Sequence, residues 1–113
     1  MKFKIIFPAG YRVENVLNDN IDINIITQDG NVFFGTLFTQ SNINYLMAKE
    51  EECYFWATDM VIAKDLRKAT IIEAIRKIIN EGYLDQAFSK IGTIEKVYPN
   101  HCSFDDIEDL NFE

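Results

Sequence analysis

The chain has 113 residues, 48% of them hydrophobic and 26% charged, which is the balance of a single globular domain with one core. Its 18 Asp and Glu residues outnumber its 11 Lys and Arg residues, so the formal net charge is -7. A molecule this acidic repels phosphate backbones and anionic lipid surfaces. We therefore expect neither nucleic acid nor a membrane as its partner.

The sequence also predicts a cytoplasmic location. The first apolar run is cut by Pro8 and Arg12 and is shorter than a signal peptide, and the nearly uncharged stretch 30–48 holds too many polar residues to span a membrane. Two cysteines, Cys53 and Cys102, allow at most one bridge, far below the disulfide density of small secreted proteins. We expect both to be reduced thiols.

The N-terminal third predicts strands. One is expected over residues 2–7, and a second over 21–25, where isoleucines alternate with polar residues. Asp29-Gly30 is typical of a hairpin turn, because Gly adopts positive φ at little cost. The returning strand, 32–39, is apolar on both faces, so we expect it inside the sheet or beneath a helix.

A short helix and another strand are expected next. Ser41 is in position to cap a helix that carries Ile43, Leu46 and Met47 on one stripe and ends at the charged residues 49–52. The aromatic and β-branched run 53–62 then predicts a strand, which would bury Cys53.

The most distinct helix is predicted from Thr70. Thr70 and Glu73 form a capping-box pattern, isoleucines recur on one stripe that would lie on the sheet, and Gly82 is expected to end the helix in a left-handed conformation. The spacing of Leu84, Phe88 and Ile91 predicts a second short helix ended by Gly92, and residues 93–98 are expected to return as a strand.

These elements predict an α+β fold, with an antiparallel sheet of about four to five strands and two to three helices packed on one face. Residues 1–98 form the expected single domain. Residues 99–113 form an acidic C-terminal tail without Lys or Arg, which we expect to be mobile.

Patterns for catalysis or metal binding are weak. Adjacent residues such as His101 and Cys102 point to opposite sides of an extended chain, and one His with two Cys lacks the paired spacing of zinc ligands. Asp59 and Asp65 could form a carboxylate pair only if the fold brought them together, and the glycines form no phosphate-binding loop. We therefore expect a non-enzyme without cofactor or metal, and His101 on the surface.

Asp59 has simpler expected roles. It lies at a sheet edge, accepts hydrogen bonds from a loop or pairs with Arg67 or Lys68, or else it faces a partner beside Trp56.

The aromatic run 54–56 allows two interpretations, because aromatic residues fill small cores and also anchor protein interfaces. In a strand, Phe55 points away from Tyr54 and Trp56, so one of the two sets faces away from the helices. That outer set could form a docking surface, and the neighbouring residues 50–52 would give it an acidic rim.

The segment 54–62 (YFWATDMVI), the helix from Thr70 and the Gly82-Tyr83 turn into Phe88 together resemble small bacterial immunity proteins encoded beside toxins. The resemblance implies an inhibitor that binds one cognate toxin, by covering its active site or blocking its assembly, and it carries no catalytic residues. Where such a toxin is a basic protein, an acidic surface accelerates the encounter. The candidate partner-binding residues are Glu50, Glu51, Glu52, Trp56, Asp59, Asp105, Asp106, Glu108 and Asp109.

Two other possibilities stay open. A small molecule could bind between the strand carrying Phe33, Phe34 and Phe38 and the helix at 71–79, although a domain this small has little interior to spare. An exposed sheet edge could also pair with a second copy of the chain to form a homodimer.

Overall fold

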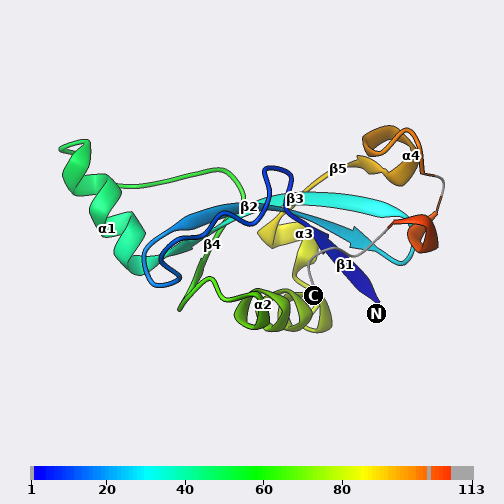
Figure 1. The fold of residues 1–113 in the computed structure, drawn as a ribbon, viewed down its shortest axis with the longest axis horizontal. Helices are drawn as coiled ribbons and strands as arrows, with labels where there is room; N and C mark the ends of the chain where they lie inside the picture. Colours follow the sequence, from blue (N-terminus) through cyan, green and yellow to red (C-terminus); the bar gives the residue numbers. More distant parts are fainter. Residues whose placement is uncertain (1, 102, 108–113) are drawn as a thin grey trace.

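The structure, a computed structural model, describes residues 2–101 and 103–107. These residues form an α+β fold with one five-stranded sheet, as expected. Figure 1 shows α1 leaving one end of the sheet, while α2 lies beneath it. In chain order the elements are β1 (Phe3–Ile6), β2 (Asn20–Thr27), β3 (Asn31–Thr39), α1 (Gln40–Lys49), β4 (Met60–Ala63), α2 (Lys68–Asn80), α3 (Leu84–Ala87), β5 (Ser89–Thr93), α4 (Ile94–Val97) and a 3-10 turn η1 (Phe104–Asp106).

The predicted hairpin of β2 and β3 is the centre of the sheet. Gly30 adopts φ 89° at its turn, and the two strands pair antiparallel from Asn20↔Phe38 to Ile26↔Val32. β1 pairs antiparallel with β2, and β3 lies inside the sheet because β4 and β5 occupy its other side. The sheet is not wholly antiparallel, since β4 runs parallel to β3.

β4 and β5 lie end to end along β3. β4 pairs with Thr36–Thr39 and β5 with residues 31–34, so the two strands meet beside Gly35. The packing at this junction is close, because a Cβ added to Gly35 would lie 1.9 Å from Cδ1 of Phe88. Only glycine fits at this position without displacing the buried Phe88 ring.

The core lies between the sheet and α2. Alternate residues of β2 point to this side, and α2 contributes Ile71 and Ile75, both 0% exposed. The stripe predicted for this helix is therefore confirmed as its buried face. The fully buried members of the cluster are Ile5, Ile23, Ile25, Leu37, Leu66, Ile71, Ile75 and Phe88.

A second, smaller cluster lies on the opposite side of the sheet, where Ile26 and Val32 pack with Ile94 of α4 and with Ile107. The helices therefore cover parts of both faces, rather than the one face that was predicted. Within the expected tail, residues 103–107 contact the domain: Ile107 is 4% exposed, and Lys4 Nζ donates hydrogen bonds to the carbonyl oxygens of Phe104 (2.7 Å) and Ile107 (2.6 Å).

α2 begins two residues before Thr70, at Lys68. The predicted capping box does not form: the N-cap residue is Arg67, which makes no side-chain cap hydrogen bond. The Asp65 carboxylate accepts the Arg67 backbone N–H at 3.0 Å and a hydrogen bond from the Thr70 side chain. Glu73 instead contacts Arg76 and Lys77 on the exposed face. The predicted end is correct, since Gly82 adopts φ 80°.

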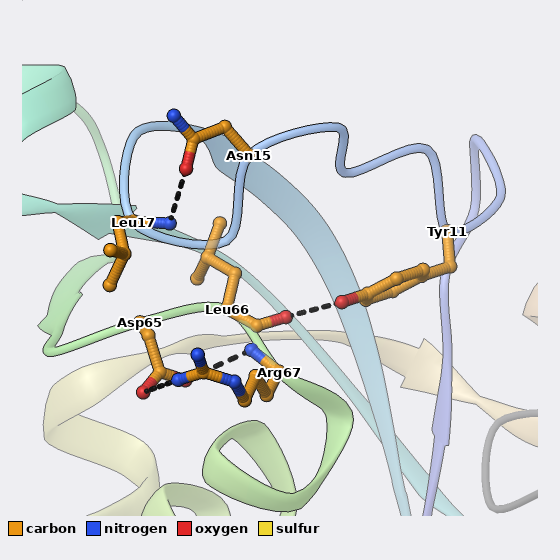
Figure 2. A network of polar contacts seen from close by, with 6 residues as sticks. All are labelled: Tyr11, Asn15, Leu17, Asp65, Leu66 and Arg67. Atoms are coloured by element: carbon orange, nitrogen blue, oxygen red, sulfur yellow. Dashed lines mark hydrogen bonds and ion pairs between the residues drawn. The ribbon is translucent and has the colours of Figure 1, made fainter.

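Figure 2 shows how the loop between β1 and β2 is fixed over the start of α2. The Tyr11 hydroxyl donates to the Leu66 carbonyl at 2.6 Å, and the Leu66 backbone N–H donates to the Val16 carbonyl at 2.8 Å. Arg67 Nη1 lies 2.9 Å from the Asp65 carboxylate in the same network. These contacts join two segments that are about fifty residues apart in sequence.

After Gly82 the predicted short helix is correct over Leu84–Ala87 (α3), and the predictions beyond it were wrong in type. The helix expected to reach Ile91 ends at Ala87, and Ser89–Thr93 is strand β5, because these residues pair with the free side of β3. The strand expected over 93–98 is the short helix α4. For Ser89–Thr93, pairing with β3 overrides the local spacing.

Within the described residues, none of the helices combines the length and the apolar character needed to cross a membrane.

Candidate functional site

The candidate site lies on α1, which projects from the body of the molecule (Figure 1). The molecule measures 45 × 27 × 27 Å, and α1 occupies one end of the long axis. Of the ten residues of this helix, only Asn42 and Ile43 are buried. Most of α1 is therefore outside the core.

Polar contacts fix the base of α1. The helix is capped by Thr39, whose hydroxyl accepts the Asn42 N–H at 3.2 Å, and not by Ser41 as predicted, because β3 continues directly into the helix. The buried Asn42 amide accepts a hydrogen bond from Asn20 at 2.8 Å and donates one to Asn18 at 3.3 Å. Three asparagines thus hold the helix to the start of β2.

The end of α1 is also well defined. Glu51 N–H donates to the Ala48 carbonyl at 3.3 Å and Glu52 N–H to the Met47 carbonyl at 2.9 Å, which is the Schellman arrangement. Glu51 itself has φ 55°, a left-handed conformation usually taken by glycine. The same arrangement ends α2, where Gly82 takes this position. The turn therefore fixes the backbone of three consecutive glutamates in spite of a conformational cost.

The segment after this turn returns along α1 without forming the predicted strand. β4 begins only at Met60, and residues 54–57 have no regular structure. Phe55 packs edge-on against Phe38 of β3, with ring centroids 5.0 Å apart. Tyr54 and Trp56 remain 58% and 70% exposed, so the expected opposition of Phe55 to its two neighbours holds although the strand does not.

α1 and the returning segment enclose a groove of about 260 Å³, here called the α1 groove. Its lining combines apolar and aromatic residues with two glutamates. The lining residues are Leu46, Met47, Glu50, Glu52, Tyr54, Phe55 and Trp56.

The structure brings together four of the candidate partner-binding residues. Glu50, Glu52 and Trp56 line the α1 groove, and Glu51 lies in the turn between the two lining glutamates. Asp105 and Asp106 lie in η1, at the opposite end of the long axis (Figure 1, red). Glu108 and Asp109 lie outside the described residues.

Asp59 has a structural position at the junction of β4 and β5. It adopts φ 54°, its carbonyl accepts the Thr36 N–H at 3.0 Å, and its carboxylate accepts the Ser89 hydroxyl at 2.9 Å. This is the edge role, with a hydrogen bond from a neighbouring segment, that the sequence suggested. Asp59 is not among the residues that line the α1 groove with Trp56.

Four lining residues were not among the candidates: Leu46, Met47, Tyr54 and Phe55. Leu46 and Met47 were predicted on one stripe of a short helix, and that helix is present as α1. What the sequence did not indicate is that the sheet ends before this stripe, so that only the returning segment covers it.

The cysteines and the histidine considered for catalysis or metal binding do not form a site within the described residues. Cys53 is an exposed free thiol rather than a buried strand residue, and His101 is half-buried with its ring against Tyr98 rather than at the surface. Cys102 lies outside the described residues. Among those that are described, no three His, Cys, Asp or Glu side chains are grouped to hold a metal ion.

The space considered for a small molecule, between β3 and α2, contains buried side chains. Phe33 and Leu37 of β3 pack there with Ile71 and Ile75 of α2. Phe38 lies on the other face, where it contacts Phe55.

A comparison of the chain with known protein families, with curated proteins and with solved structures finds no match.

Proposed function

We propose that this protein is a binding module that docks onto a basic region of a partner protein through the α1 groove and inhibits that partner, as the resemblance to immunity proteins implies. The observation that carries the proposal is the exposure of Trp56 and Tyr54 around an apolar groove on a projecting helix. Partly buried aromatic anchors surrounded by a polar rim are the usual centre of protein interfaces.

Charge supports a basic partner. Residues 49–52 carry three glutamates against one lysine, and the whole chain has a net charge of -7. Acidic residues elsewhere, including Asp105 and Asp106, add a long-range field that raises the association rate without contacting the partner.

Core side chains pack between β3 and α2, and a pocket of about 280 Å³ lies beside them, lined by Phe33 of β3 and Ile79 of α2. We favour protein docking over a small molecule because the α1 groove presents exposed aromatic side chains and this pocket does not.

The test is affinity capture from a lysate of the organism that encodes the protein, with three baits. Wild type and Tyr83→Ala should retain a stoichiometric basic protein, and Trp56→Ala should lose it. Tyr83 is the matched control because it is an aromatic residue of similar exposure, 57%, on the turn between α2 and α3.

With the captured protein purified, we expect Trp56→Ala to weaken binding by at least about 30-fold, as for a central interface aromatic. If the partner is an enzyme, wild type should abolish its activity at a one-to-one ratio. Equal capture by wild type and Trp56→Ala would contradict the proposal, as would equal loss with both alanine variants.

A further inference from the structure

The α1 groove combines two features that suit one kind of side chain. Trp56 is 70% exposed, and the residues Glu50 and Glu52 line the same groove. An aromatic face attracts a cation through its quadrupole, and a carboxylate pairs with the same cation from the side. An uncharged apolar occupant would leave both glutamates without a counter-charge.

We infer that the α1 groove receives the side chain of an arginine from the partner protein. This inference rests on the proposed function, since it assigns the chemistry of the residue that the groove recognises. Arginine fits better than lysine because the guanidinium group is planar, stacks on an aromatic ring and presents several N–H donors to carboxylates at once. Its methylene stem would contact the apolar side chains of Leu46 and Met47.

The groove is organised before the ligand arrives. The Schellman turn fixes the backbone of residues 50–52, and the contact of Phe55 with Phe38 anchors the returning segment to β3. Less conformational freedom is therefore lost on binding, which strengthens a weak, single-residue interaction.

The chain contains one tryptophan, so its indole N–H gives one resonance that reports directly on the groove. The probe is the capped tripeptide Gly-Arg-Gly, titrated to about 10 mM against labelled protein at low salt. The matched probe is Gly-citrulline-Gly, which keeps the shape of arginine and removes its charge. We expect a saturable shift of the Trp56 resonance with the arginine peptide and none with the citrulline peptide.

Variants separate the groove from general electrostatics. Glu52→Gln should weaken binding of the arginine peptide about threefold to tenfold, the range of one exposed charge pair beside an aromatic ring. Glu95→Gln removes the same charge from exposed α4 at the other end of the molecule and should leave the affinity unchanged. A matching shift with citrulline, or equal effects of the two variants, would overturn the inference.

The two proposals fail differently. If Trp56→Ala loses the captured partner while the arginine peptide does not bind, the groove is an interface that recognises something other than arginine. If the peptide binds but Trp56→Ala retains the partner, the groove binds cations and the proposed docking surface is wrong.

Discussion

Replacing Gly35 with alanine tests the junction of β3, β4 and β5. The new Cβ would lie 1.9 Å and 2.3 Å from Cδ1 and Cε1 of Phe88 and 3.0 Å from the Asp59 carbonyl oxygen. Carbon atoms in contact lie about 3.5–4.0 Å apart, so the ring would have to move by about 1.5 Å. Phe88 is 1% exposed within the core and has little room to move.

Overpacking a core costs about 1–3 kcal/mol, and this displacement is at the upper end. We expect Gly35→Ala to lower the free energy of unfolding by about 3 kcal/mol and the melting temperature by roughly 10–15 °C. The assay is urea denaturation followed by far-UV circular dichroism. A loss below about 0.5 kcal/mol would refute the packing described at this junction.

A double-mutant cycle isolates the contact. Phe88→Val lacks both ring atoms that the new Cβ would meet, and alone it should cost about 2–3 kcal/mol. In that background Gly35→Ala should cost at least about 1 kcal/mol less than in wild type. Strict additivity would mean that Phe88 is not what the added methyl group meets.

Three further variants test separate contacts, each by urea denaturation. Tyr11→Phe removes the hydrogen bond to the Leu66 carbonyl and should cost about 1 kcal/mol; no loss would place that hydroxyl in solvent. Hydrogen bonds from the Thr70 side chain and the Arg67 backbone hold the pKa of Asp65 below its usual 3.8. The ionised Asp65 carboxylate therefore stabilises the fold above pH 3.8, and this stabilisation is lost as the pH falls through the lowered pKa. Asp65→Asn should therefore be less stable than wild type at neutral pH, and the difference should shrink under acid; a constant difference would exclude this linkage. Glu51→Gly should raise stability by about 1 kcal/mol, because glycine adopts φ 55° without strain, and a destabilised variant would contradict that reasoning.

Local patterns predicted the elements whose signals are contained within them. The hairpin at Asp29-Gly30 and the end of α2 at Gly82 are correct because each depends on the positive φ of one glycine. β2 is correct because its alternating isoleucines specify both a strand and its buried face. These signals need no knowledge of the rest of the chain.

The wrong predictions concern segments whose conformation depends on a distant partner. Ser89–Thr93 is a strand because it pairs with the part of β3 that β4 leaves unpaired. The sequence of the segment itself does not indicate that this pairing position is available. The run 53–62 has high strand propensity, but Thr58-Asp59 forms a turn and only Met60–Ala63 pairs with β3. The residues of 53–62 have the propensity for a strand, but a strand forms only where the backbone pairs with β3.

The sequence indicated the glutamates and the tryptophan of the candidate site, but not the groove that they line. Residues 50–52 and Trp56 are close in sequence, so their proximity follows from chain connectivity. Asp105 lies far from the α1 groove because Ile107 packs against β2 and β3. The acidic composition of residues 99–113 gave no indication of this packing.

Local contacts hold α1 in place although the helix adds little to the core. An isolated helix of ten residues is marginal in water, and this one buries only Asn42 and Ile43. It is nevertheless held by a threonine cap, by three asparagines at its base and by a Schellman turn that forces Glu51 into a left-handed conformation. These local contacts stabilise an element that contributes little to the core, and what they hold in place is the surface around Trp56. The docking proposed for the α1 groove would give this helix, outside the chain, the contacts that it does not make with the core.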